Sequence, residues 1–372
     1  MRIEKKTIQR QITSLPALIL CVSAMVFLNA CKPLSKNTSA EKSLYLLSNN
    51  DIVIGMLPEV GGRIAVFRPA NGGNMIKADT DRFAEKDSER LVPPKGALKK
   101  EYREYFGNIV ITGPQSRWWQ EQTVFPDKKK NKGKWPWPPD PFLMFGAYKL
   151  ETNTAAMVRF TGPQSPVSGV TLTREITLSG KKARVITTAR NMRRENITRD
   201  LWSMTALEAN THVYIPVRGN ADVRFIRRGQ STNISWEIAG SHFTCHVRQF
   251  LTNAFIESDK VFITASSGYV AVFKGNAMLL ITFPVEDASA VSPEHGSIEL
   301  AVTVKATPAE SFLTLSHHSA LATLQSGAEM TLDETWYLFP YTGNSTLVDE
   351  TAFLKKTVSD LNHALAVTSD LK

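Results

Sequence analysis

Alternating apolar and polar positions run along most of the chain from Leu44 onward, and they predict one β-strand after another. The clearest pair lies near the middle. Val170–Leu178 alternates apolar residues with threonine and glutamate, Ser179–Lys181 turns the chain, and Ala183–Asn191 runs back. A period of two is typical of antiparallel strands with one buried face and one solvated face. The pattern therefore predicts an antiparallel hairpin over residues 170–191.

Similar segments recur on both sides of this hairpin, bounded by turn signals such as Asn71–Asn74. Helical spacing is seen over Asp349–Leu365, where four leucine and valine residues fall on one face. Many strands and one late helix predict an all-β fold, a large antiparallel sandwich with a short C-terminal helix. The other predicted strands are Asp51–Leu57, Arg63–Arg68, Tyr105–Thr112, Leu143–Glu151, Ile197–Glu208, His212–Val217, Ala221–Arg227, Asn233–Ile238, Val261–Ala265, Tyr269–Lys274, Met278–Val285, Ser297–Lys305, Glu310–Ser316 and Glu329–Phe339.

Two long segments, Thr80–Tyr105 and Gly113–Phe145, have neither a strand period nor a helical one. The second contains six prolines and four of the seven tryptophans, which are Trp118, Trp119, Trp135 and Trp137. A loop of this length inside a compact domain is usually functional or disordered, and disordered segments are poor in aromatic residues. We therefore predict that Gly113–Phe145 is an ordered, functional loop.

The first thirty residues have the pattern of a secretory signal. Basic residues at the start are followed by a short apolar run, Leu15–Leu28, and then by small residues before Cys31. The run is short for a membrane span, which needs roughly 20 apolar residues. Leu28–Cys31 resembles the lipobox of bacterial lipoproteins, in which the cysteine is lipidated and becomes the mature N-terminus. An uncleaved anchor, the alternative, also places the domain outside the cytoplasm.

This resemblance implies that acyl chains on Cys31 anchor the protein in the cell envelope. In lipoproteins of enteric-like bacteria an aspartate after the cysteine retains the protein at the inner membrane, so Lys32 favours the outer membrane. The predicted organisation is a signal peptide over residues 1–30, a lipidated tether over 31–43, a β-sandwich over 44–346, and a C-terminal helix and tail over 347–372.

Charge and cysteine content narrow the classes of partner. The net charge falls from +9 to +6 when residues 1–30, with four basic residues and one acidic residue, are removed. Lys128–Lys134 is the one dense basic run, and an exported lipoprotein rarely meets nucleic acid, so we expect a glycan, the lipid surface or solvent beside it. After removal of Cys21 and acylation of Cys31, Cys245 alone remains, so a large core and no disulfide must stabilise the domain.

The order of features in Leu172–His212 resembles the middle of the galactose mutarotase-like (aldose 1-epimerase-like) superfamily, with a strand, a turn and a strand that ends at Asn191. Leu57–Phe67 resembles the N-terminal hairpin of the family, and Ser326–Leu338 resembles its final strand. The tryptophan loop resembles uncharacterised bacterial proteins assigned to the same fold. The resemblance covers about residues 48–340 and implies a β-supersandwich whose concave sheet faces sugars.

The acid and base of a mutarotase are not visible at the matching positions. The family uses a glutamate that takes the proton of the anomeric hydroxyl and a histidine that protonates the ring oxygen. Leu201–Thr205, on the strand that should carry the histidine, has none, and His212 lies several residues beyond it. His317 and His318 stand where the glutamate is expected. His317 and His212 are therefore weak catalytic candidates, each in need of a nearby carboxylate.

Trp202, in place of an acid or base, makes better sense as a platform on which the C–H face of a sugar stacks. The loop tryptophans are expected in the same cleft, unless they close the core or fix the loop. Arg63 is expected to hold a carboxylate or hydroxyl, or else to form a structural ion pair. The predicted binding residues are Arg63, Gln115, Trp118, Trp119, Trp135, Trp137, Asp140 and Trp202.

No phosphate-binding loop, nucleophile elbow or paired-cysteine zinc pattern occurs, so neither a cofactor nor a metal is expected. His242, Cys245 and His246 are interpreted as ordinary strand residues because the cysteine would point away from both histidines. The first hypothesis is an envelope-anchored lipoprotein that binds carbohydrate in a tryptophan-lined cleft without turnover. The second is an aldose 1-epimerase-like enzyme with a rearranged acid/base pair, and the third is a structural envelope protein that binds another protein.

Overall fold

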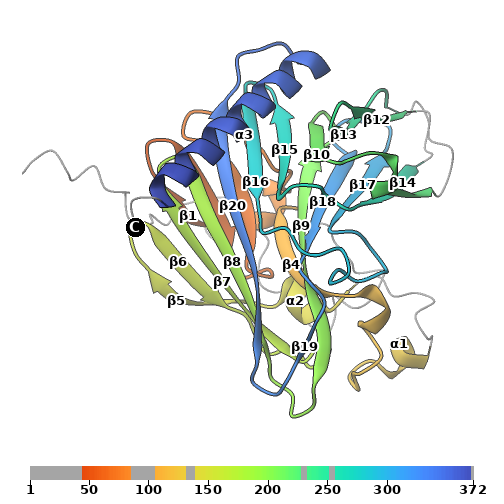
Figure 1. The fold of residues 1–372 in the computed structure, drawn as a ribbon. Helices are drawn as coiled ribbons and strands as arrows, with labels where there is room; N and C mark the ends of the chain where they lie inside the picture. Colours follow the sequence, from red (N-terminus) through yellow and green to blue (C-terminus); the bar gives the residue numbers. More distant parts are fainter. Residues whose placement is uncertain (1–43, 85–104, 131–138, 228–232, 251–255, 370–372) are drawn as a thin grey trace, which may run out of the picture.

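The computed structural model describes residues 44–84, 105–130, 139–227, 233–250 and 256–369, which form two antiparallel sheets of ten strands each (Figure 1). The first sheet contains, in spatial order, β1 (Tyr45–Ser48), β2 (Ile52–Leu57), β3 (Arg63–Pro69), β4 (Asn108–Gly113), β9 (Ile197–Glu208), β18 (Phe312–His318), β17 (Ile298–Val304), β14 (Glu257–Ile263) and β11 (Val223–Arg227), and β19 (Ala322–Leu324) pairs with β9.

The second sheet lies against the first and completes a sandwich. Its spatial order is β12 (Ile234–Ala239), β13 (His242–Val247), β10 (His212–Pro216), β15 (Tyr269–Lys274), β16 (Ala277–Thr282), β20 (Glu329–Pro340), β8 (Lys182–Asn191), β7 (Val170–Ser179), β6 (Met157–Thr161) and β5 (Lys149–Asn153). This architecture confirms the predicted all-β sandwich. The central hairpin is confirmed in detail, because β7 pairs with β8 from Val170 opposite Asn191 to Ser179 opposite Lys182.

The helices are short except for the last. They are η1 (Thr80–Ala84), η4 (Gln115–Arg117), α1 (Pro126–Lys130), α2 (Pro141–Phe145), η5 (Asn220–Asp222) and α3 (Leu347–Ser369). The predicted strand over Leu143–Glu151 is wrong at its start, where α2 forms and the strand begins only at Lys149. Asp140 caps α2 by accepting a hydrogen bond from the Phe142 amide, and Pro141 occupies the first turn, a position it favours.

The core lies between the sheets, where the apolar faces of both meet. Trp336 of β20, which is fully buried, contacts Phe67 of β3 edge-to-face with ring centroids 5.1 Å apart. One charged side chain also crosses this interior. Arg174 of β7 donates to Gly62 O at 2.9 Å and to Asn108 Oδ1 at 2.6 Å. Burial lowers the pKa of this guanidinium, and these hydrogen bonds offset part of the cost of burying it.

Helix α3 covers part of the outer face of the second sheet, across β15, β16 and β20 (Figure 1). Leu354 is fully buried there, and Glu350 accepts hydrogen bonds from Tyr214 Oη at 2.5 Å and from His212 Nδ1 at 2.9 Å. The contact with Glu350 raises the pKa of His212 above its ordinary value. Within the described residues, no helix is both long enough and apolar enough to cross a membrane.

Replacing Arg174 by methionine tests the buried polar crossing between the sheets. Arg174→Met leaves Asn108 Oδ1 and Gly62 O without their donor, and each unpaired buried acceptor costs about 1–3 kcal/mol. We expect the free energy of unfolding in urea to fall by about 2–4 kcal/mol.

Arg184 on the neighbouring strand is the matched control. Its side chain is 57% exposed and pairs with Asp333 at the surface. Arg184→Met should change the free energy of unfolding by less than about 1 kcal/mol, as exposed ion pairs do. Equal losses for the two arginine variants would contradict a stabilising role for the buried network.

Candidate functional site

Two neighbouring central strands, β9 and β18, carry polar side chains on both faces of the first sheet. Ser203 and Thr205 of β9 face the second sheet, as does His317 of β18. Because successive side chains of a strand point to opposite faces, Trp202 and His318 lie on the outer face. The alternation therefore separates two polar clusters, an inner one at His317 and an outer one at His318.

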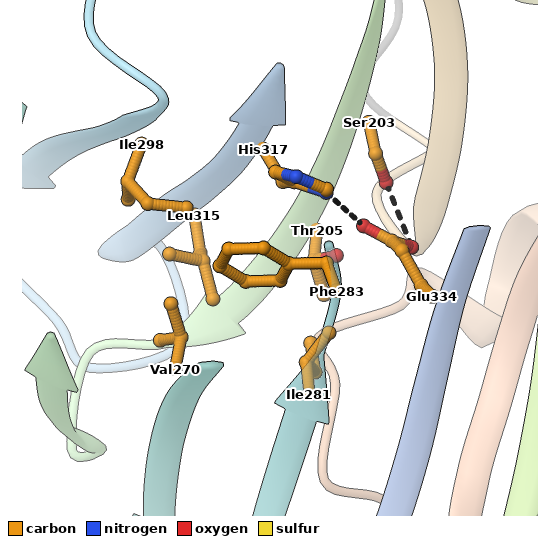
Figure 2. Close-up of a pocket in the computed structure, with 9 residues that line it drawn as sticks. All are labelled: Ser203, Thr205, Val270, Ile281, Phe283, Ile298, Leu315, His317 and Glu334. Atoms are coloured by element: carbon orange, nitrogen blue, oxygen red, sulfur yellow. Dashed lines mark hydrogen bonds and ion pairs between the residues drawn. The ribbon is translucent and has the colours of Figure 1, made fainter. Parts of the chain in front are cut away.

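The inner cluster is centred on a histidine–carboxylate pair inside the sandwich (Figure 2). His317 Nδ1 lies 3.1 Å from Glu334 Oε1, and Ser203 donates to Glu334 Oε2 at 3.3 Å. The ring of Phe283 stacks on His317 at a centroid distance of 3.9 Å. The other lining residues are Thr205, Val270, Ile281, Ile298 and Leu315.

This inner cavity is too small for a sugar. Its volume is about 10 Å³, close to what one water molecule requires. His317 thus has the nearby carboxylate that a catalytic role demands, but no room for a pyranose ring beside it. The inner cluster has the dimensions of a structural polar site that encloses one water-sized space.

The outer cluster consists of Asp200 of β9, His318 of β18 and His295 from the segment before β17. His295 Nε2 lies 2.7 Å from Asp200 Oδ2, and His318 Nδ1 lies 3.6 Å from the same oxygen. The two imidazole rings stack with centroids 3.6 Å apart. Asp200 and His318 are fully buried, and His295 is 9% exposed.

Several polar atoms of this outer cluster have no hydrogen-bond partner among the described residues. They are Asp200 Oδ1 and Oδ2, His295 Nε2, His318 Nδ1 and Nε2, Trp202 Nε1 and Ser316 Oγ. The 2.7 Å contact between His295 Nε2 and Asp200 Oδ2 is an ion pair when the imidazole is protonated. A buried polar group without a hydrogen bond costs about 1–3 kcal/mol, so such groups are expected to have a further partner, which can be a ligand, an ion or an ordered water.

Electrostatics give these groups distinct protonation states. Burial alone would raise the pKa of Asp200, but the contacts with His295 and His318 outweigh it and hold the pKa at about 2. Burial lowers the pKa of His318 to about 4, so this ring is neutral at neutral pH. Burial also opposes charge on His295, yet the neighbouring Asp200 raises its pKa overall.

Backbone and loops hold the outer cluster in place. Gly113 pairs with Asp200 across β4 and β9, and a Cβ at position 113 would collide with Asp200 Oδ1. Ser116, in η4, donates its amide to Glu294 Oε2 at 3.1 Å, which joins the start of the tryptophan loop to the segment that carries His295. On the far side of the cluster, Lys260 pairs with Glu299 at 2.7 Å.

The described tryptophans of the predicted site are buried by packing. Trp118 stacks on Trp202 at 5.6 Å, and Lys260 Nζ lies 5.6 Å from the Trp202 ring centroid. Trp119 contacts Phe125 edge-to-face within its own loop. Trp118 and Trp119 are each 3% exposed and Trp202 is 5% exposed, so none presents an open ring face. Trp135, Trp137 and the lipidation residue Cys31 lie outside the described residues.

Two of the predicted polar binding residues, Arg63 and Asp140, make structural hydrogen bonds to the backbone. The Arg63 guanidinium donates to the carbonyls of Val60 and Met144, each at 2.9 Å, and to Phe106 O at 2.6 Å. Asp140 caps α2 and accepts a hydrogen bond from the Ser168 amide at 3.1 Å. Gln115 is half-buried in η4, at the end of the segment near the outer cluster.

The second weak catalytic candidate, His212, lies on the other sheet, under α3. Its carboxylate partner is Glu350, and the ring of His246 lies 5.5 Å away. Sequence reasoning missed Asp200 and His295. The signal that could have found Asp200 is a carboxylate within a strand predicted to be largely buried. The sequence around His295 carries no such signal.

The fit between Gly113 and Asp200 can be tested by a double-mutant cycle. Gly113→Ala should destabilise the protein by about 1–3 kcal/mol, the usual cost of overpacking, because the new methyl group collides with the carboxylate. In an Asp200→Ala background the collision is gone, and most of this cost should disappear. Thermal and urea unfolding measure both; an unchanged cost in that background would contradict the contact.

Comparison with solved structures shows the fold. The Slr1438 protein from Synechocystis sp. PCC 6803 is 11% identical and aligns over 84% of this chain and 98% of its own with a TM-score of 0.51. A galactose mutarotase-like protein from Lactobacillus casei is 11% identical over 80% of this chain and all of its own, also with a TM-score of 0.51. A galactose mutarotase-like protein from Clostridium acetobutylicum is 10% identical and aligns over 84% of this chain and 99% of its own, with a TM-score of 0.50.

These likenesses confirm the predicted galactose mutarotase-like superfamily at the level of the fold. A search of curated protein sequences gave no match. A family model does match, over residues 44–339, which is most of the chain. The protein therefore belongs to the family described as Domain of unknown function (DUF4380), and its fold is that of the galactose mutarotase-like proteins.

Proposed function

We propose that this protein is an envelope-anchored lipoprotein that binds carbohydrate on the outer face of its first sheet, around Asp200, Trp202 and His318. The observation that carries the proposal is the set of buried, unpartnered polar atoms beside stacked indole rings on that face. Binding sites that hold small polar ligands combine apolar walls with a few converging donors and acceptors in this way.

The atoms of the cluster match the needs of sugar hydroxyls, which donate and accept hydrogen bonds at once. Asp200 offers acceptors, the Trp202 indole offers a donor, and the Ser316 hydroxyl offers both. Apolar contact with the C–H edge of a sugar would come from the Trp118–Trp202 pair. A hydroxyl that binds here restores hydrogen bonds to groups that lack them, and it is thereby favoured over an apolar group.

The fold supports the same class of ligand. Two of the similar structures are named galactose mutarotase-like proteins, and mutarotation is a reaction of sugars. At 10–11% identity the comparison shows a similar fold only. The proposed ligand class therefore rests on the outer cluster and the fold together.

Because the residues of the cluster are almost entirely buried, we expect the end or edge of a glycan to bind, and not a fully enclosed ring. His295 is 9% exposed, and the side chain of Lys260 is 27% exposed and pairs with Glu299. In this proposal the ligand approaches from the side of these two residues. The rings act as a wall of the site in this proposal, which replaces the open platform expected from the sequence.

Replacing Trp202 by phenylalanine tests the indole donor. Trp202→Phe keeps an aromatic ring against Trp118 but removes the unpartnered N–H. If that N–H binds a sugar hydroxyl, the dissociation constant should rise about five-fold, since one hydrogen bond contributes about 1 kcal/mol. Calorimetric titration with the best ligand from a glycan array measures the change.

Trp236→Phe is the matched control, because Trp236 of β12 also has a buried indole N–H without a partner but lies at the edge of the second sheet. Its affinity for carbohydrate should equal that of the unaltered protein. No binding to any glycan on the array, by the folded protein, would end the proposal.

Polarimetry of freshly dissolved aldoses separates binding from turnover. The proposal expects no acceleration of anomer exchange, because the inner His317–Glu334 pair has no room for a sugar. Acceleration that is lost in His212→Ala or His317→Ala would favour the alternative, an aldose 1-epimerase-like enzyme with a rearranged acid/base pair.

The anchor proposal rests on residues 1–31, whose sequence resembles a lipoprotein signal, and Lys32 favours the outer membrane. Cys31→Ser removes the thiol that would be acylated. The variant should no longer incorporate labelled palmitate in growing cells, and it should leave the outer-membrane fraction. Unchanged labelling and fractionation of Cys31→Ser would rule out lipidation at this residue.

A further inference from the structure

We propose that Asp200, His295 and His318 together bind one divalent transition-metal ion. This inference goes beyond carbohydrate binding, because it concerns the cluster itself and is tested without any sugar. The three side chains come from β9, from the segment before β17 and from β18, and their ligand atoms all lie within 4.8 Å of one another. Two imidazoles and one carboxylate form a recurrent set of protein ligands for such ions.

The spacing of the ligand atoms suits a shared ion. Atoms bound about 2.1 Å from a zinc-like ion lie roughly 3–3.4 Å from each other in ordinary coordination geometries. The His295 Nε2–Asp200 Oδ2 distance of 2.7 Å and the His318 Nδ1–Asp200 Oδ2 distance of 3.6 Å lie on either side of this range. Because the two imidazole rings stack, at least one of them must turn to direct its nitrogen at an ion shared by all three ligands.

The tautomer of His295 points to the same conclusion. Its Nδ1 lies 2.9 Å from Gly296 O, and a carbonyl can only accept, so Nδ1 carries a hydrogen. In a neutral ring Nε2 then has no hydrogen to donate to Asp200 Oδ2, so a contact of 2.7 Å between these two atoms needs a proton or a metal ion to offset their repulsion. A metal-binding histidine commonly donates its other N–H to a backbone carbonyl in this manner.

Burial and charge also favour a cation. Asp200 is fully buried, and neither of its carboxylate oxygens has a hydrogen-bond partner among the described residues. Both nitrogens of His318 are likewise unpartnered. Because Gly113 has no side chain, the Asp200 carboxylate fits beside it. A Cβ at position 113 would collide with that carboxylate. A proton on His295 is the rival to a metal ion as partner of Asp200.

The ligand chemistry indicates which ions fit. Imidazole nitrogen suits zinc, iron, cobalt, nickel and copper, whereas calcium and magnesium prefer sites made of oxygen ligands. Three protein ligands leave at least one coordination position open. If carbohydrate binds here as proposed above, one of its hydroxyls would occupy that position.

The test uses the full chain, purified in detergent without a histidine tag. Bound metal is removed with a chelator, and the protein is dialysed against Zn²⁺, Co²⁺, Ni²⁺, Mn²⁺ or Ca²⁺ and then against metal-free buffer. Elemental analysis should find close to one Zn²⁺ or Co²⁺ per chain and far less Ca²⁺. The chelated protein should melt at least about 3 °C below the reloaded protein, since a ligand that binds only the folded state stabilises it.

Single replacements identify the ligands. Asp200→Asn, His295→Gln and His318→Gln should each weaken Zn²⁺ binding at least about 10-fold, the lower end of what even indirect contacts contribute. His246→Gln, which alters a half-buried strand histidine of the second sheet, is the control and should bind Zn²⁺ as the unaltered protein does. If His318→Gln fails to fold, His295→Gln, at the partly exposed edge of the cluster, still decides the question.

The proposal is overturned if the folded protein retains less than about 0.1 equivalent of every ion and its melting temperature does not respond to any of them. It is also overturned if His295→Gln binds Zn²⁺ as tightly as the control. Metal binding without glycan binding would reject only the carbohydrate proposal, and glycan binding by a folded protein that retains no ion after reloading would reject only the metal site.

Discussion

A polar group removed from water must find a partner, and strand β9 shows two outcomes of this constraint on its two faces. On the inner face, Asn108 donates to Ser203 Oγ and Thr205 Oγ1, and Arg174 in turn donates to Asn108, so these buried side chains are joined by hydrogen bonds. On the outer face, Asp200 and Trp202 are as deeply buried but lack such partners. The first arrangement is typical of structure, and the second is typical of a site that binds something.

The sequence predicted the frame better than the site, and the reason is physical. Strand periodicity depends on neighbours along the chain, so the hairpin over 170–191 and the late helix were predictable. The start of the predicted strand at Leu143 failed because a capping aspartate and a proline override a short apolar run. His317 and His318 were recognisable as a pair with opposite faces. Asp200 and His295 meet only through the pairing of distant strands, which no local pattern encodes.

The amino-acid composition of the tryptophan loop predicted that the loop is ordered, but it did not predict which way its rings face. An ordered loop was expected from its aromatic content, and its described part packs against the sheet through Trp118 on Trp202. Trp118 and Trp202, which were expected to offer open ring faces, are buried beside the cluster and help to exclude water from it. A low local polarity strengthens every electrostatic contact made there, so the loop contributes to the site by what it keeps out.

Helix α3 has a consequence for how the molecule meets its surroundings. By packing on β15, β16 and β20 it covers part of the outer surface of the second sheet (Figure 1). The outer cluster lies on the outer face of the first sheet, which is the opposite side of the sandwich. A partner that approaches from the helical side is separated from Asp200 by the full thickness of two sheets. In the anchored protein proposed above, rotation about the tether would therefore decide whether the cluster faces the lipid or the space beyond it.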